Sequence, residues 1–292
     1  MDTVISIEVV SPQPQDSVHA AIQRALGWFA RVERACSRFD PTSEVQQLLR
    51  RVGEPVPASP LLFEAARFAL TLAARTGGAF DPTVGHVLER KGFNRHYLSG
   101  ERIRSPIPTD ASVSYRDVWL DPKQSTITLR RPLVLDLGAV AKGLAIDLAA
   151  RELAAFDSFC IEAGGDLYAR GRNGSGQPWR IGVRDPRHPE AVAYLLDVSD
   201  RAVCTSGDYE RRTADDSEHH LVDPRTGRAA RALASVTVVA PTALAADGLA
   251  TAAFVLGPRR GLRLLTEEGV DGVLITSAGA VRTTPGLRRN TR

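Results

Sequence analysis

The stretch Leu133-Val-Leu-Asp-Leu-Gly-Ala-Val-Ala-Lys-Gly-Leu-Ala-Ile-Asp147 decides how the rest of the chain is interpreted. Its first five residues predict a short apolar strand, and the residues from about Ala139 onward predict a helix. The first N–H groups of a helix have no partner within it, and Lys142 adds a positive charge at that end. Gly138 and Gly143 allow the backbone to approach a ligand. The corner therefore predicts an anion site, although an ordinary strand-to-helix junction with a solvated lysine fits the same residues.

The glycines of this corner match no common nucleotide-binding pattern. The lysine precedes the second glycine, so the stretch is neither GxGxxG nor GxxxxGK[ST]. Neither the Rossmann nor the P-loop mechanism is implied by these residues, and the rest of the chain has to supply the function.

Composition indicates a globular protein. The chain has 292 residues, of which 43% are hydrophobic and 24% charged, with a formal net charge of +3. These values exclude extensive disorder, and because no basic stripe interleaves with aromatic residues we expect no nucleic acid partner. No apolar run is long enough to span a membrane. The first ten residues alternate as in a strand rather than as in a signal peptide, which favours a cytoplasmic location. A periplasmic location is the alternative if an export signal has been removed.

The three cysteines are too few and too far apart for a disulfide framework or a zinc site. Cys36, Cys160 and Cys204 form no CxxC pair. We expect them to behave as small hydrophobic residues.

The hydrophobic pattern predicts helices first and then mostly strands. Apolar residues recur at helical spacing in four segments, and the second of them is followed by a glycine pair typical of a helix end. The expected helices are Ser17–Ser37, Ser59–Thr76, about Ala139–Phe156 and Ala243–Leu256. Short alternating segments between residues 159 and 240 predict strands. We therefore predict an α+β fold, a single compact unit in which a largely antiparallel sheet packs with helices, forming one domain over residues 1–292.

Asp247 and Thr251 are the strongest candidates for a metal site. They lie four residues apart on an expected helix and so share one face. Carboxylate and hydroxyl oxygens suit Mg²⁺, which completes its coordination with water or substrate phosphates. The alternative is a structural role, with Asp247 favoured by the helix dipole and Thr251 bonding to the preceding turn.

Three further features lie among the predicted strands. The pair Gly164-Gly165 permits a bulky ligand to approach or forms a bend. Ser206 belongs to Thr205-Ser-Gly-Asp-Tyr-Glu210, which suits phosphate binding or a tight turn. His220 is the only histidine among these glycine-rich motifs, and an imidazole suits a proton-accepting role.

The order of these motifs resembles the ApbE-type FAD:protein FMN transferases over nearly the whole chain. No Gly-x-Ser-x-Gly, HExxH or EF-hand pattern competes with this resemblance. The motifs are Met1-Asp-Thr, Ser37-Arg-Phe-Asp-Pro-Thr-Ser-Glu44, Phe80-Asp-Pro-Thr83, Asp136-Leu-Gly-Ala-Val-Ala-Lys-Gly143, Glu162-Ala-Gly-Gly-Asp166, Thr205-Ser-Gly-Asp-Tyr-Glu210, His220-Leu-Val-Asp-Pro-Arg-Thr-Gly227 and Ala246-Asp-Gly-Leu-Ala-Thr251.

The resemblance implies a Mg²⁺-dependent enzyme that moves FMN from FAD to a threonine or serine of an acceptor flavoprotein of an electron-transfer system, releasing AMP. It implies that Asp247, Thr251 and the carbonyl of Ala139 hold the metal, and that His220 and Asp247 are catalytic. The residues that it assigns to FAD are Met1, Asp81, Lys142, Gly164, Gly165, Ser206 and Leu221.

One departure from the family leaves the reaction open. The family often has Asn where this chain has Leu49, at a position that faces FAD and influences whether flavin is transferred or hydrolysed. An FAD pyrophosphatase that forms FMN and AMP, and a non-catalytic FAD-binding or assembly protein, are therefore the alternatives. For every enzymatic alternative, we expect the segments around Lys142 and Asp247 to be adjacent in the fold.

Overall fold

The computed structural model describes residues 3–95, 100–103, 112–213, 215 and 217–287. The chain divides into two compact units. The first contains Ala30–Ala141 and Arg211–Ala229, and the second contains Thr3–Phe29, Lys142–Glu210 and Ala230–Arg292. The structure confirms the predicted α+β class. The prediction of one transferase domain over residues 1–292 stays a prediction.

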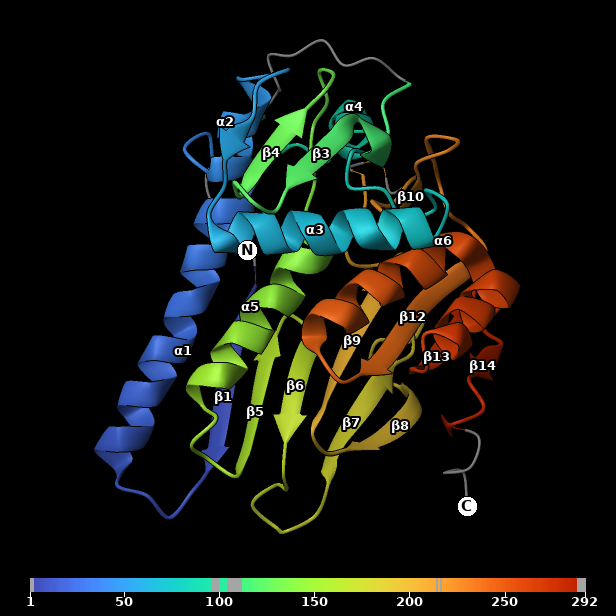
Figure 1. The fold of residues 1–292 in the computed structure, drawn as a ribbon. Helices are drawn as coiled ribbons and strands as arrows, with labels where there is room; N and C mark the ends of the chain where they lie inside the picture. Colours follow the sequence, from blue (N-terminus) through green and yellow to red (C-terminus); the bar gives the residue numbers. More distant parts are fainter. Residues whose placement is uncertain (1–2, 96–99, 104–111, 214, 216, 288–292) are drawn as a thin grey trace. The chain divides into compact units, whose positions relative to one another are not determined.

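A seven-stranded sheet forms the centre of the second unit (Figure 1). Its strand order is β1-β5-β6-β9-β12-β13-β14, and every neighbouring pair is antiparallel. The strands are β1 Ile5–Val10, β5 Ser158–Ala163, β6 Asp166–Arg170, β9 Arg201–Gly207, β12 Leu233–Ala240, β13 Asp271–Thr276 and β14 Val281–Thr283. The largely antiparallel sheet is therefore as predicted.

Both faces of this sheet are covered, as strand β9 illustrates. On one face Cys204 Sγ contacts the carbonyl oxygen of Ala243 in helix α6 (Ala243–Glu267) at 3.6 Å. The adjacent Val203 belongs to an apolar cluster with the hairpin of β7 (Trp179–Arg184) and β8 (Val192–Val198). Neighbouring residues of a strand point to opposite faces, so the hairpin packs on the face away from α6.

Among its described residues, the second unit contains α6, the start of α1 (Gln15–Cys36) and most of α5 (Gly138–Glu152). Figure 1 shows α5 and α6 in front of the sheet. Helix α6 is kinked at Gly257, whose φ of 77° lies in the left-handed region, and Pro258 follows it. Proline lacks the N–H that a continuous helix needs, so α6 consists of two helical segments joined at this point.

The first unit contains the helix α3, shorter helices and a three-stranded sheet of order β2-β4-β3. Helix α3 begins after Ser59, whose side chain caps the amide of Leu62, and ends before Gly77 and Gly78, which both have positive φ, as predicted. The elements are α2 Glu44–Leu49, β2 Val56–Pro57, α3 Pro60–Arg75, α4 Gly85–Arg90, the 3-10 helix η1 Tyr115–Asp117, β3 Val118–Asp121, β4 Thr126–Leu129, β10 Val222–Asp223 and β11 Arg228–Ala229.

The strand predicted for residues 133–137 is wrong. Within this run only Val134 makes a strand-type bridge, to Val84. Leu133, Leu135 and Leu137 are nevertheless buried, each at most 2% exposed. The run is apolar because it enters the core of the first unit, and it lacks the neighbouring partners that a strand needs.

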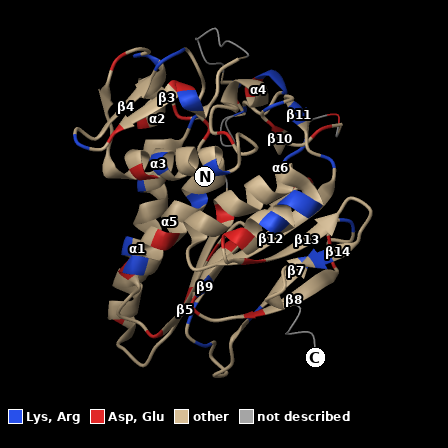
Figure 2. Ribbon diagram, turned by 45° about the vertical axis from the view of Figure 1, so that its right-hand side comes forward, with Lys and Arg blue, Asp and Glu red and all other residues tan. Residues whose placement is uncertain are grey.

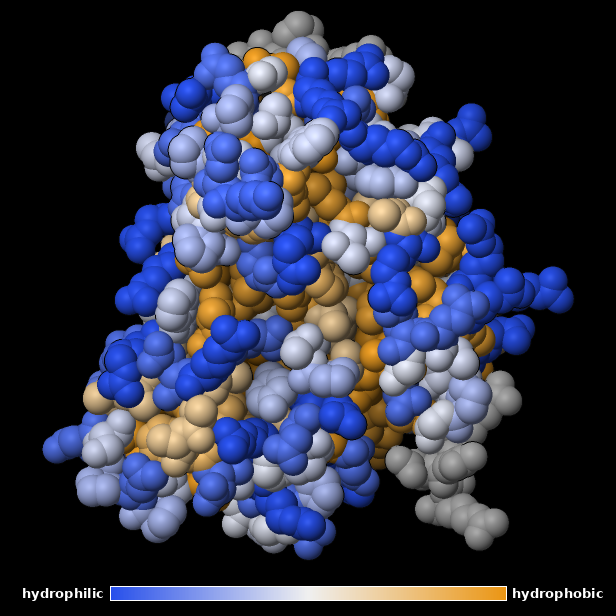
Figure 3. Space-filling model, in the orientation of Figure 1, coloured by the Kyte–Doolittle hydropathy of each residue, from blue (hydrophilic) through white to orange (hydrophobic). Residues whose placement is uncertain are grey.

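Acidic and basic residues are interspersed on the elements drawn in Figure 2, and hydrophilic residues surround smaller apolar patches on the face shown in Figure 3. Within the described part of the chain, no helix has both the length and the hydropathy required to cross a bilayer.

Candidate functional site

Helices α5 and α6 touch at Gly143. A Cβ atom built on this glycine would lie 2.3 Å from the carbonyl oxygen of Ala243, so only glycine permits the approach. Asp147, one turn later on α5, accepts hydrogen bonds from the amides of Ala243 and Leu244 at 2.7 and 2.9 Å. These amides lack partners within α6, and Asp147 caps them. The predicted adjacency of the two segments is thus found within the second unit.

This contact brings Asp247 to helix α5. Its Oδ2 accepts a hydrogen bond from the amide of Gly143 at 3.2 Å, and the residue is 6% exposed. Thr251 lies one turn further along α6, and its hydroxyl is 3.0 Å from Ser206 Oγ at the end of β9. The structure thus brings together Asp247, Thr251 and Ser206, three of the predicted site residues.

Lys142 extends this group with a positive charge. Its ammonium donates to Asp166 Oδ2, and Asp166 Oδ1 accepts from the amide of Thr205 at 2.9 Å. Burial disfavours the charged ammonium, but the carboxylates of Asp166 and Asp247 outweigh this effect and raise the pKa of Lys142. Lys142 is therefore a cation at every physiological pH, as an anion-binding role requires.

The donor atoms of α6 fit a magnesium ion. Asp247 and Thr251 offer a carboxylate and a hydroxyl from successive turns, and both are hard oxygen ligands. Among the described residues no group of three or more His, Cys, Asp and Glu side chains is arranged to hold a metal. A metal here would need further ligands from backbone carbonyls, water or substrate. Ala139, the predicted carbonyl ligand, belongs to the first unit, and its assignment stays a prediction.

Gly164 and Gly165 form the two-residue turn between β5 and β6. Their φ values are 61° and 87°, and Ala163 pairs with Asp166 across the turn. Positive φ at both positions is typical of a type I′ hairpin turn. Residues 158–170, at the start of the region for which strands were predicted, therefore form a hairpin of two strands. Both glycines are exposed, and their predicted contact with FAD stays a prediction.

Asp81 lies in the first unit, where it organises a loop. Its Oδ1 accepts from the amide and hydroxyl of Thr83 at 2.9 and 2.7 Å, and its Oδ2 accepts from the amide of Tyr115 at 3.0 Å. Burial raises the pKa of Asp81, and these hydrogen bonds oppose that effect. The hydrogen bond from the amide of Thr83 to the Asp81 side chain two residues earlier is that of an Asx turn, and the predicted contact of Asp81 with FAD stays a prediction.

His220 and Leu221 also lie in the first unit. The Nδ1 atom of His220 is 3.3 Å from the carbonyl oxygen of Arg211. A carbonyl only accepts, so the neutral ring carries its proton on Nδ1 and leaves Nε2 as the acceptor. Burial, together with the charge of Arg211, lowers the pKa of His220 to about 3. The ring is therefore neutral at pH 7, as a base must be, but weakly basic. Leu221 is 5% exposed.

Met1 and Leu49 are the remaining positions to which the resemblance gave a role. Met1 lies outside the described residues. Leu49, where the family often has Asn, is 2% exposed at the end of α2, so it is part of the apolar core of the first unit.

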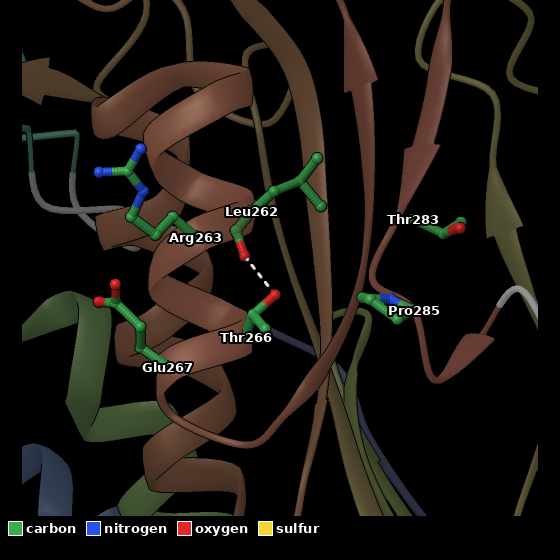
Figure 4. A pocket seen from close by; sticks show the side chains of 6 residues that line it. All are labelled: Leu262, Arg263, Thr266, Glu267, Thr283 and Pro285. Carbon is green, nitrogen blue, oxygen red and sulfur yellow. Dashed lines mark hydrogen bonds between the residues drawn. The ribbon is translucent and has the colours of Figure 1, made fainter.

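A pocket of about 450 Å³ lies elsewhere, between the second half of α6 and β14 (Figure 4). The residues that line it are Leu262, Arg263, Thr266, Glu267, Thr283 and Pro285. The hydroxyl of Thr266 donates to the carbonyl of Leu262 in its own helix. None of the predicted site residues lines this pocket.

Two residues that organise the site had no role predicted for them. Asp147 caps α6, and Asp166 holds Lys142. The sequence offered only a weak signal for each: an acidic residue inside a helix, and an aspartate directly after a glycine pair.

Solved structures share this fold over almost the entire chain. The ApbE protein of Thermotoga maritima matches with a TM-score of 0.88 at 32% identity, covering 99% of this chain and 96% of that one. The flavin transferase ApbE of Vibrio cholerae matches with a TM-score of 0.83 at 26% identity and the same coverage. The fold is therefore that of the ApbE proteins.

The sequence comparisons agree. The chain belongs to the ApbE family, whose model matches residues 1–274. The FAD:protein FMN transferase of Treponema pallidum is 33% identical over 98% of this chain and 85% of its own length. That of Escherichia coli K12 is 33% identical over 77% of this chain and 67% of its own length. The family predicted from the ordered motifs is confirmed.

Proposed function

We propose that this protein transfers FMN from FAD to a serine or threonine hydroxyl of an acceptor flavoprotein and releases AMP, with Mg²⁺ as the metal. The relatives named FAD:protein FMN transferase support the reaction class. The observation that carries the proposal is the contact of α5 with α6, which unites the cation of Lys142 with the oxygen donors of Asp247 and Thr251 in one unit.

Each residue of this group has a distinct part in the proposal. Asp247 and Thr251 would hold Mg²⁺, with Ala139 as the carbonyl ligand. The bound ion would neutralise charge on the pyrophosphate and orient it. Lys142 would bind a phosphate oxygen of FAD, and Ser206 would fix the hydroxyl of Thr251. Positioning and charge stabilisation dominate phosphoryl transfer, and these roles would supply both.

The reaction exchanges one P–O bond for another. The acceptor hydroxyl oxygen forms a bond to the phosphorus of the FMN half, and the bond from that phosphorus to the bridging oxygen breaks. AMP leaves with the bridging oxygen and its electron pair. The hydroxyl proton passes to a base, for which His220 Nε2 is the candidate. Its pKa of about 3 would rise beside an anionic substrate, because an opposite charge favours the imidazolium.

The experiment combines the protein with FAD, Mg²⁺ and an electron-transfer flavoprotein that lacks covalent flavin. We expect AMP in solution and an acceptor whose mass has increased by FMN less water. Free FMN and AMP without an adduct would replace the proposal with FAD hydrolysis.

Hydrolysis is the second candidate because of Leu49. Water would take the place of the acceptor hydroxyl, and the same metal and lysine would serve. The buried apolar side chain at this position offers no polar group. Binding of FAD without release of AMP would instead support the non-catalytic alternative. The cytoplasmic location expected from the sequence stays a prediction.

A further inference from the structure

Asp166 connects three parts of the second unit through one carboxylate. It begins β6, directly after the glycine turn, and is 1% exposed. One oxygen accepts from the amide of Thr205 in β9, and the other accepts from the ammonium of Lys142 in α5. A buried carboxylate is costly unless both oxygens are satisfied, and here each oxygen has a partner from a different element.

The lysine keeps donors for a ligand. An ammonium group has three N–H donors. Among the described residues, the only hydrogen-bond acceptor of Lys142 is Asp166 Oδ2, so two donors remain. The lysine side chain is 24% exposed, in contrast to 2% for Asp166. One donor is therefore directed into the protein, and the partly exposed side chain keeps two N–H donors that Asp166 does not use.

Without Asp166 the ammonium would lose this direction. Lysine has a flexible stem of four carbons and orients itself poorly. The charge of Asp247 also acts on Lys142. A released ammonium would be drawn toward the carboxylate to which we assign the metal, and it would no longer be held in one orientation.

We propose that Asp166 is a positioning residue that fixes the ammonium of Lys142 for the pyrophosphate of FAD. The inference rests on the proposed function. Asp166 touches neither the substrate nor the reacting atoms in this scheme, and it acts through Lys142 alone. The competing explanation is that Asp166 only ties β6 to β9 through Thr205.

Asparagine at position 166 separates the two explanations. Its side-chain oxygen still accepts from the amide of Thr205, but its NH₂ group faces the ammonium and removes the ion pair. Asp271→Asn is the matched control, because Asp271 also lies in this sheet and accepts from Thr284 Oγ1 at 2.8 Å, with no bond to Lys142.

The test is a double-mutant cycle of Asp166→Asn and Lys142→Gln. The two measurements are the FAD dissociation constant, from flavin fluorescence with Mg²⁺ present, and kcat/KM for AMP release. We expect each single variant to weaken FAD binding about tenfold, and the double variant to match Lys142→Gln within about twofold, because the two residues act as one unit. Asp271→Asn should bind FAD as the unchanged protein does.

Independent, multiplying effects of the two substitutions would overturn the inference, as would tight FAD binding by Asp166→Asn. A melting temperature that falls while FAD binding is unchanged would assign Asp166 the structural role. If the unchanged protein binds FAD but releases no AMP, the proposed reaction fails while the binding cycle still decides the role of Asp166. A protein that binds no FAD overturns both.

Discussion

Buried aspartates serve different ends in the two units. In the second unit, Asp166 and Asp247 bond to groups of other elements, namely the ammonium of Lys142 and the amides of Thr205 and Gly143. In the first unit, Asp81 instead accepts hydrogen bonds from the amides of Thr83, two residues further along the chain, and of Tyr115. The bonds in the second unit bring charged side chains together beside α5 and α6, and the bonds of Asp81 stabilise the conformation of loops.

Asp136, also in the first unit, combines both kinds of contact at the start of the stretch that leads into α5. One oxygen caps the amide of Gly138 at 2.8 Å, and the other pairs with Arg38 Nε at 2.5 Å. Aspartates that look equivalent in the motifs thus differ in what they hold. Substitution should therefore affect mainly stability in the first unit and mainly function in the second.

The largest loss of stability is expected for Asp136→Asn. The side chains of Arg38 and Asp136 are 4% and 17% exposed, and removing one partner of a fully buried ion pair costs about 3–5 kcal/mol, so we expect a loss of up to that size. Burial opposes the charge of Asp136, but Arg38, the amide of Gly138 and the charge of Arg211 together outweigh burial and lower the pKa of Asp136. The stabilisation that the Asp136 carboxylate provides is complete above pH about 4, which is its pKa in the unfolded chain. It is lost as the pH falls through the lower pKa of the folded protein.

Urea unfolding at pH 7 measures this loss. Glu64→Gln is the control, because its pair with Arg67 is exposed and worth no more than about 0.5 kcal/mol. Equal losses for the two variants would show that Asp136 does not hold the first unit together.

Gly143→Ala tests the helix contact of the second unit. The added Cβ would overlap the backbone of Ala243, and we expect a loss of about 1–3 kcal/mol from overpacking. Gly27→Ala is the matched control in α1, since nothing lies within 4 Å of its Cβ position. Alanine is the better helix former, so the control should gain about 0.5–1 kcal/mol. Thermal unfolding compares the two, and a stabilised Gly143→Ala variant would contradict the close contact.

His220→Gln tests whether burial of the His220 ring in the first unit makes the stability of the protein depend on pH. The folded pKa of about 3 lies below the unfolded value, so between these values only the unfolded chain binds the proton. Above pH about 6.5 the His220 ring is neutral in both the folded and the unfolded state. Below that pH, the free energy of unfolding falls by about 1.4 kcal/mol per pH unit relative to the variant. Urea unfolding between pH 7 and 4 measures the difference. Parallel pH profiles would mean that the ring is freely solvated.

The sequence predicted the class of fold and the adjacency of the Lys142 and Asp247 segments. The order of the motifs made this possible, since no single motif specified a partner. The strand predicted for residues 133–137 was wrong because a run of apolar residues indicates that a segment is buried, but not that it pairs with a neighbouring strand. Gly143 was interpreted as room for a ligand, and the structure shows that it makes room for α6.

The role of Asp166 could not be read from the sequence for a different reason. It depends on the pairing of β6 with β9, where Leu167 lies opposite Val203. That pairing joins strands about thirty-five residues apart in sequence, and local patterns do not specify which strands become neighbours.

The most direct test of the proposed site is the Mg²⁺ dependence of AMP release for the unchanged protein and for Asp247→Asn. The variant keeps the size of the side chain but loses the charge, and we expect a loss of at least about 100-fold at every Mg²⁺ concentration, with little change in melting temperature. Mg²⁺-dependent release of AMP by Asp247→Asn at the rate of the unchanged protein would contradict the assignment of the metal to α6.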